Sequence, residues 1–236
     1  ESWSGRLPGV RRPGWVLLAA AAGGAGWAVA ELARPRRVDI RSFDPDEVAR
    51  LETAMWRSCY DRRRLPLFGQ LVSLLQGQFH LQPLRAVALA GLASRAAAVF
   101  QVGQSHDDYR RALPYLERYY AAIRTVSEVP FDPERAASLE LEWWIVHREA
   151  ALHPPGDLEH ALAALAAELY QVPAERLWTH ASRRAEAMTI RDHASRRAVG
   201  VLDDDWDRIE AVLWVAWKAL ADEVQTVREE AARQEA

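Results

Sequence analysis

Lysine and cysteine are nearly missing from this chain. Lys218 is the single lysine among 30 basic residues, and Cys59 is the single cysteine among 236 residues. One thiol allows neither an intramolecular disulfide nor a zinc site built from cysteines. Positive charge is not in excess either, because 33 acidic residues leave a net charge of −3. Without a basic field the chain does not bind the nucleic-acid backbone non-specifically, so no nucleic-acid partner is expected.

Sequence motifs that fix a chemistry are missing as well. The chain has no glycine-rich phosphate loop, no Ser-His-Asp arrangement and no paired Cys/His spacing. We therefore predict no cofactor and no catalytic residue, which favours a protein that is not an enzyme. Hydrophobic residues make up 50% of the chain and charged residues 27%, a globular balance without the alternation of strands. The predicted fold class is all-α.

An uncharged stretch lies near the start of the chain. Residues 14–30 read GWVLLAAAAGGAGWAVA, and the apolar run extends to residue 33 if Glu31 lies at a membrane interface. Because about 20 apolar residues span a bilayer, we predict a single-pass membrane anchor within residues 1–34. A slight excess of arginine after the run favours a cytoplasmic location for the large domain. The alternatives are a secretory signal and a soluble alanine-rich helix packed on the domain.

Two residue types in this stretch indicate how it would pack. Tryptophans stand near its two ends, where interfacial indoles are expected. Glycines among the alanines would let another helix approach closely. The residues predicted to make these contacts are Trp15, Gly23, Gly24, Gly26 and Trp27. The expected partners of residues 14–33 are other membrane protein subunits and lipid.

The rest of the chain contains an internal repeat. Phe43-Asp44-Pro45 opens one stretch, and Phe131-Asp132-Pro133 opens another 88 residues later. Later blocks match in the same order, with insertions only in loops. They pair Leu71, Leu74 and Phe79 with Leu162, Leu165 and Tyr170, Ala93-Ser94-Arg95 with Ala181-Ser182-Arg183, Asp107-Asp108 with Asp204-Asp205, and Tyr120 with Trp217. We predict a duplicated helical bundle, with four-helix units at 43–128 and 131–224 related by a pseudo-two-fold axis.

Each unit is predicted to hold four helices. Asp44 and Asp132 are placed to cap the first helix of each unit, with a proline at the first helical position. Pro114 predicts a kink or restart within a fourth helix. The expected helices are 45–64, 66–79, 83–102 and 106–127, then 133–150, 157–171, 173–198 and 203–232. Residues 35–42 are predicted to be a linker and residues 225–236 a charged helical tail.

Glu52 and Glu140 are equivalent in the two units and keep a functional hypothesis open. If their helices meet at the pseudo-two-fold axis, two carboxylates would come together near His147, as in helical carboxylate-metal sites. The Glu-x-x-His motifs of such sites are missing, so a metal site is the minor interpretation. The main one is that each glutamate hydrogen-bonds an arginine or a tryptophan indole within its own unit.

The other charge clusters are typical of helix ends. Acidic pairs at helix starts cap free N–H groups; they are Asp107-Asp108 and Asp204-Asp205. Arginine runs could bind phosphates or lipid head groups, but solvated helix C-termini are the favoured interpretation. These runs are Arg62-Arg63-Arg64, Arg183-Arg184 and Arg196-Arg197.

The sequence therefore favours a membrane-anchored helical accessory or scaffold subunit. It would bind and stabilise a larger membrane protein complex, for example a respiratory or photosynthetic assembly, without catalysis of its own. The alternative is a helical ligand-binding protein or carboxylate-metal enzyme with its site at the pseudo-two-fold interface.

Overall fold

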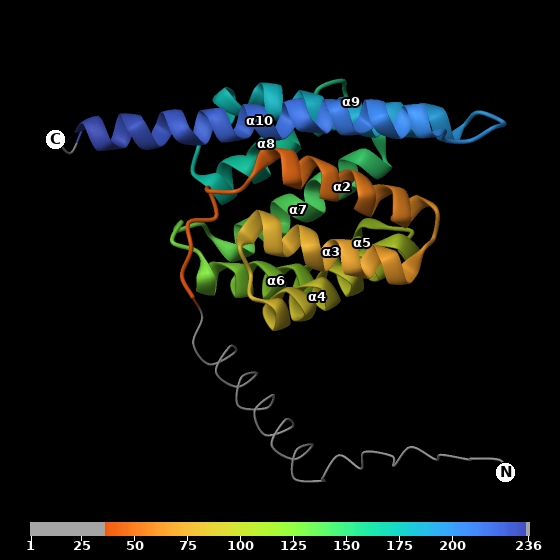
Figure 1. Ribbon diagram of the computed structural model, residues 1–236. Helices are drawn as coiled ribbons and strands as arrows, with labels where there is room; N and C mark the ends of the chain where they lie inside the picture. Colours follow the sequence, from red (N-terminus) through yellow and green to blue (C-terminus); the bar gives the residue numbers. More distant parts are fainter. Residues whose placement is uncertain (1–35, 235–236) are drawn as a thin grey trace, which may run out of the picture. The chain divides into compact units, whose positions relative to one another are not determined.

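The structure is a computed structural model that describes residues 36–234, and helices with short connections make up this part of the chain (Figure 1). The all-α prediction is confirmed for these residues. The predicted membrane anchor at 1–34, with Trp15, Gly23, Gly24, Gly26 and Trp27, lies outside them.

Nine α-helices follow one another along the described residues. They are α2 (Pro45–Tyr60), α3 (Arg64–Phe79), α4 (Pro83–Val102), α5 (His106–Arg110), α6 (Leu113–Val126), α7 (Pro133–Arg148), α8 (Asp157–Tyr170), α9 (Trp178–Ser195) and α10 (Asp203–Gln234). Short 3-10 turns at Ala150–Leu152 and Ala174–Leu177 precede α8 and α9.

Local capping explains several of these boundaries. Asp44 Oδ1 accepts the Asp46 N–H at 2.9 Å, and Asp132 Oδ1 accepts the Glu134 N–H at the same distance. Both aspartates thus satisfy N–H groups that the first helical turn leaves unpaired. The predicted restart near Pro114 is confirmed, because α5 ends at Arg110 and α6 begins at Leu113.

The arginine run between α2 and α3 differs from its prediction. α2 ends at Tyr60, four residues earlier than expected, and α3 begins at Arg64. Arg62 and Arg63 still stand at the C-terminus of α2, because their N–H groups donate to the carbonyls of Cys59 and Ser58. Arg63 is also the N-cap residue of α3, and Arg64 belongs to α3 instead of a helix C-terminus. The helix ends at a left-handed turn, in which Arg62 has a φ of 57° and the Arg63 N–H donates to the Ser58 carbonyl at 2.8 Å.

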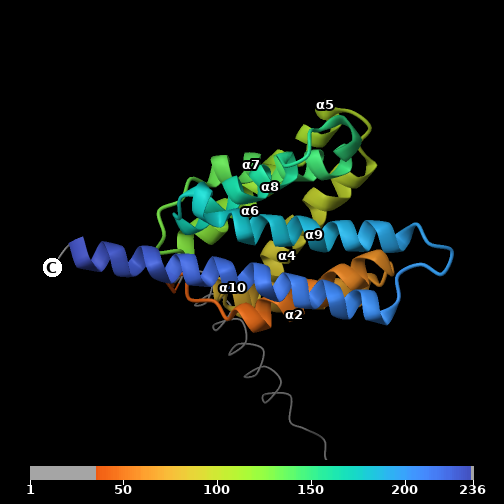
Figure 2. The same cartoon turned by 90° about the horizontal axis from the view of Figure 1, so that it is seen from above.

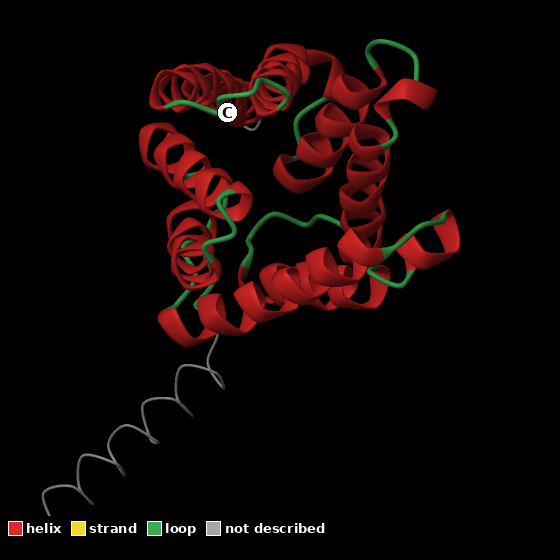
Figure 3. Cartoon of the chain, turned by 90° about the vertical axis from the view of Figure 1, so that its right-hand side faces the viewer, coloured by secondary structure: helices red, strands yellow, loops and turns green. Residues whose placement is uncertain are grey.

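The helices pack as a closed ring. Going around it, α2 packs on α3, α3 on α4, α4 on α6, α6 on α7, α7 on α8, α8 on α9, α9 on α10, and α10 back on α2. Figure 3 shows these helices around a square, and Figure 2 shows them from above. The first helix of each predicted unit packs on the last helix of the other. The described residues 36–234 accordingly belong to one compact unit.

The predicted linker belongs to this compact unit from Arg36 onward. The Val38 N–H donates to the Val126 carbonyl at 2.8 Å, and the Glu128 N–H donates to the Val38 carbonyl at 2.8 Å. Ile40 is fully buried in the core. At the other end, α10 continues without interruption through the described part of the predicted tail, to Gln234.

Candidate functional site

Glu52 lies inside the ring, on α2, and its carboxylate is fully engaged. Arg184 on α9 donates from Nη2 to Glu52 Oε1. Trp217 on α10 donates from its indole Nε1 to Glu52 Oε2 at 2.6 Å. The Arg184 guanidinium also lies 5.5 Å from the Trp217 ring centroid, within the range of a cation–π contact. A buried charge is tolerated here because an opposite charge and a hydrogen bond compensate it.

Glu140 occupies the corresponding place on α7. The Tyr120 hydroxyl on α6 donates to Glu140 Oε2 at 2.8 Å, and the Trp144 indole donates to Oε1 at 2.9 Å. No arginine hydrogen-bonds this carboxylate within residues 36–234. Burial therefore raises the pKa of Glu140, although these hydrogen bonds and the charge of Arg184 oppose the shift.

Arg184 links the two glutamates electrostatically. It is buried, and its guanidinium interacts with the charge of Glu140 as well as that of Glu52. The prediction of a solvated arginine was wrong at this position, because α9 turns Arg184 into the ring. Each glutamate was expected to bind an arginine or an indole of its own unit. Glu52 does bind an arginine and an indole, but both come from the other half of the chain. Glu140 binds the Trp144 indole of its own half, as predicted, and also the Tyr120 hydroxyl of the other half, which was not predicted.

Tyrosines and a histidine complete the polar interior. Burial raises the pKa of Tyr119, Tyr120 and Tyr170 well above the ordinary value, so these phenols stay neutral. The Gln78 side chain donates to the Tyr170 hydroxyl at 2.8 Å. His180 is buried beside Trp217, and burial lowers its pKa to about 3. Of the two interior glutamates, Glu52 is therefore paired with a cation and Glu140 accepts from neutral donors.

His147, the third residue of the metal hypothesis, has a partner of its own. Its Nε2 lies 3.2 Å from Asp192 Oδ2 on α9. Burial of Asp192 alone would raise its pKa, but the contacts with His147 and Arg191 lower it overall. Within residues 36–234, no group of three or more His, Cys, Asp or Glu side chains could hold a metal ion. The described arrangement does not bring His147 together with both glutamates in such a group.

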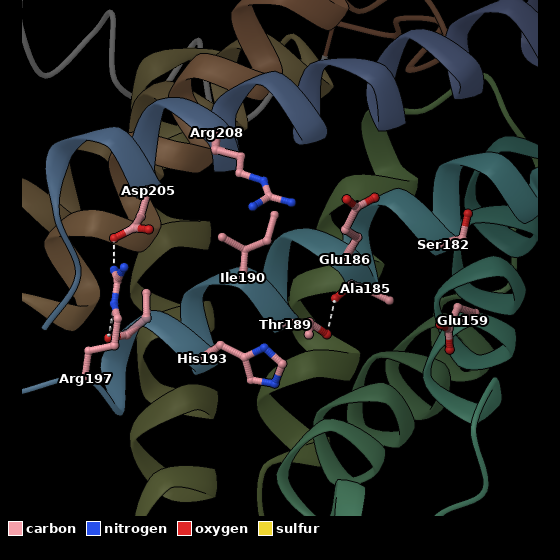
Figure 4. Close-up of a pocket in the computed structure, with 11 residues that line it drawn as sticks. Glu159, Ser182, Ala185, Glu186, Thr189, Ile190, His193, Arg197, Asp205 and Arg208 are labelled. Carbon is pink, nitrogen blue, oxygen red and sulfur yellow. Dashed lines mark hydrogen bonds and ion pairs between the residues drawn. The ribbon is translucent and has the colours of Figure 1, made fainter.

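A groove on the outer side of the ring was not anticipated from the sequence (Figure 4). It has a volume of about 650 Å³ and lies mainly along α9, between α8 and the start of α10. Side chains of both signs reach it, including Glu186, Arg208 and the ion pair of Arg197 with Asp205. Such a lining can bind a polar segment that carries both charges. Its residues are scattered over three helices, so no local motif could have indicated it.

Comparisons with models of protein families, with curated proteins and with solved structures found no match to this chain.

Proposed function

We propose that this chain is a membrane-associated helical scaffold, an accessory subunit that stabilises a larger membrane assembly and catalyses no reaction. The cytoplasmic location of the ring and the anchor at residues 14–33 belong to this proposal. The observation that carries it is the nature of α4. Among the helices of residues 36–234, α4 alone is long and apolar enough to cross a membrane, by length and composition only, with a mean hydropathy of 1.3.

The exposure of α4 supports a contact with lipid or with a membrane subunit. Only 22% of its apolar stretch is buried within the ring. Exposed apolar patches on a folded unit mark interaction sites when they are contiguous. On the outward face of α4 the exposed residues include Val87, Ala88, Gly91, Ala98 and Val102. Small residues of this kind allow close approach of another helix in a membrane.

The interior supports a structural role. Glu52 and Glu140 both accept hydrogen bonds from neighbouring helices, and these bonds fix the helices in register. The same interior supports the proposal of a duplicated chain. Glu52 corresponds to Glu140 and Trp217 to Tyr120 in the repeat, so one side-chain contact is made twice, between α2 and α10 and between α7 and α6.

The groove of Figure 4 offers a place for a partner. α8 and α9 stand in the second predicted unit where α3 and α4 stand in the first, so the groove lies across the ring from the apolar helix α4. A scaffold of this kind has one apolar side for the membrane and one polar side for a water-exposed subunit.

The test uses the full chain in its native membranes. We expect it to remain in the membrane pellet after alkaline carbonate washing and to co-purify with other membrane proteins in mild detergent. Placing charges in the apolar run, with Leu18→Arg and Ala22→Arg, costs about 2.5–3.5 kcal/mol per charge in a membrane helix and should release the chain. The matched control adds the same two charges on the exposed surface, with Gln225→Arg and Gln234→Arg. A wild-type chain found in the soluble fraction without partners contradicts the proposal.

A further inference from the structure

The helical hairpin α3–α4 has an unusual charge pattern. From Arg62 to His106 the chain contains no aspartate or glutamate, although the whole chain has a net charge of −3. The charged residues of this stretch are Arg62, Arg63, Arg64, Arg85 and Arg95. This hairpin of an acidic protein is therefore basic and apolar between Asp61 and Asp107.

Three of these arginines stand beside exposed apolar side chains. Arg62, Arg63 and Arg64 are exposed, and Leu65 and Phe68 follow them with 87% and 36% of their surface accessible. We call residues 62–68 the α2–α3 corner. A large exposed leucine next to three cations is the pairing that interfacial membrane segments use, with apolar side chains in the acyl boundary and basic ones at the phosphates.

The end of α4 extends this surface. The α3 and α4 helices are joined by residues 80–82 and pack on each other, so they run antiparallel and Val102 lies at the same end as the corner (Figure 1). Val102 is 74% exposed. Both helices thus have an exposed apolar side chain at the end of the hairpin that carries the arginines.

Ion pairs do not account for the arginines. Arg62 and Arg63 close the last turn of α2, where a helix dipole favours positive charge. Arg63 and Arg64 also begin α3, the helix end whose dipole disfavours positive charge, and the first turn of α3 has no acidic residue. Arg62 adopts a positive φ of 57°, which is uncommon for a side chain of this size. Within the part of the chain that the structure describes, none of the three forms an ion pair. Local conflicts of this kind are expected where a residue serves a function.

The second half of the chain supplies a comparison. The α8–α9 pair occupies the place in the ring that corresponds to α3–α4, and it carries acidic and basic residues together. Leu152 lies in the connection before α8 and is 78% exposed, but Glu149 and Asp157 surround it in the sequence. An exposed leucine at this position of the fold therefore does not require a surrounding without acidic residues. Of the two hairpins, only α3–α4 has such a surrounding.

We propose that the α2–α3 corner docks on the surface of an anionic phospholipid bilayer. Arg62, Arg63 and Arg64 would contact lipid phosphates, and Leu65 and Phe68 would enter the acyl boundary. The inference rests on the proposed membrane association and adds to it the surface and the lipid charge. It commits to lipid because the apolar area and the unpaired cations lie together on one exposed edge.

The test places a single fluorescent label in the full chain. Because Cys59 is the only cysteine, Cys59→Ser combined with Leu65→Cys allows an environment-sensitive dye at the corner. We expect its emission to shift to the blue on phosphatidylcholine vesicles that contain phosphatidylserine, and far less on phosphatidylcholine alone. The matched control carries the dye on Leu152→Cys in the same Cys59→Ser background and should not shift.

Charge removal gives the second measurement. Each basic residue near an anionic membrane contributes roughly fivefold, so Arg62→Gln, Arg63→Gln and Arg64→Gln together should lower the ratio of shifted to unshifted label about a hundredfold. Removing the same charge elsewhere, with Arg50→Gln, Arg196→Gln and Arg233→Gln, should leave the ratio nearly unchanged. Raised salt should also lower the ratio of shifted to unshifted label, because it screens the attraction between the arginines and the anionic lipid. This measurement tests the proposal without replacing the arginines.

The outcomes separate this inference from the proposed function. If the chain floats with vesicles but the Leu65→Cys label does not shift, or shifts no more than the Leu152→Cys label, the corner is not a docking surface and the membrane association still stands. If the label shifts equally on neutral vesicles, recognition of anionic lipid is refuted. If the chain floats with no vesicles of either composition, both proposals fail.

Discussion

Replacing His180 with asparagine should flatten the dependence of stability on pH. The His180 ring is buried, it donates from Nδ1 to the Ala216 carbonyl at 2.9 Å, and it stands edge-on to Trp217 at 5.2 Å. Burial lowers the pKa of His180 from 6.5 to about 3, and the charge of Arg184 acts in the same direction. The folded protein therefore keeps this imidazole neutral under mildly acidic conditions.

The sign and size of the effect follow from proton linkage. Between pH 6.5 and pH 3 the unfolded chain binds a proton on this histidine and the folded chain does not. Its contribution to stability is present above pH 6.5 and is lost as the pH falls, with a slope that approaches 1.4 kcal/mol per pH unit. From pH 7 to pH 5 the loss amounts to about 2 kcal/mol.

The measurement compares urea unfolding of wild type and His180→Asn at several pH values. The asparagine amide can take the place of Nδ1 toward Ala216, and the cavity left by the smaller side chain costs the same at every pH. Carboxylates with a lowered pKa, such as Asp39 and Asp192, also destabilise the fold in acid, but they are common to both proteins and cancel. The free-energy gap between the two proteins should therefore narrow by about 2 kcal/mol from pH 7 to pH 5.

A matched control comes from the same helix. His193 also lies on α9 but is exposed, so His193→Asn should give a curve parallel to that of the wild type. If the gap between wild type and His180→Asn stays constant over this range, His180 titrates in the folded state as it does in the unfolded chain. The interpretation that the buried His180 imidazole stays neutral in the folded protein would then be wrong.

Three further changes test the ring interior and α4. Arg184→Met should lower the free energy of unfolding by about 3–5 kcal/mol, because it leaves the Glu52 carboxylate buried without its cation. In urea unfolding, adding Glu52→Gln to this variant should restore part of the lost free energy. If the losses of the two substitutions add up instead, the pairing of Arg184 with Glu52 is contradicted. Gly103→Ala should cost about 1–3 kcal/mol in thermal unfolding, since the new Cβ would lie 2.8 Å from Tyr109 Cδ1. Gly91→Ala, with no atom of another element within 4 Å, should instead stabilise α4 by about 0.5–1 kcal/mol, and a loss there would mean that its outer face is covered.

Helix starts could be predicted from the sequence because their signals are local. Asp44-Pro45 and Asp132-Pro133 combine an aspartate carboxylate, which accepts hydrogen bonds from the first turn, with a proline, which has no backbone N–H to pair. Both begin a helix at the expected place. The bounds of α4 also match the prediction, from Pro83 to Val102. In each case the deciding groups lie within a few residues of the boundary.

The polar interior could not be predicted in the same way. Arg184 stands next to Arg183 in a helix rich in charge, and nothing in that local pattern distinguishes the buried arginine from the exposed one. Its burial depends on Glu52, 132 positions away, and on the ring that brings α9 to the inside face of α2. The predicted repeat singled out both glutamates, but which residues they bind is decided by the packing of the whole ring.

The two halves differ in their third helices, α4 and α9, both in the charge that faces the interior and in the residues exposed outside. If Ala93-Ser94-Arg95 corresponds to Ala181-Ser182-Arg183, the counterpart of Arg184 is Ala96, which is fully buried in α4. The ring therefore has one interior cation for two glutamates, and Glu140 depends on neutral donors. The same helix that lacks the interior cation also has an apolar outer face without acids. Under the proposed duplication, both asymmetries therefore lie in one helix: α4 has no interior cation at Ala96 and no acidic residue on its exposed face.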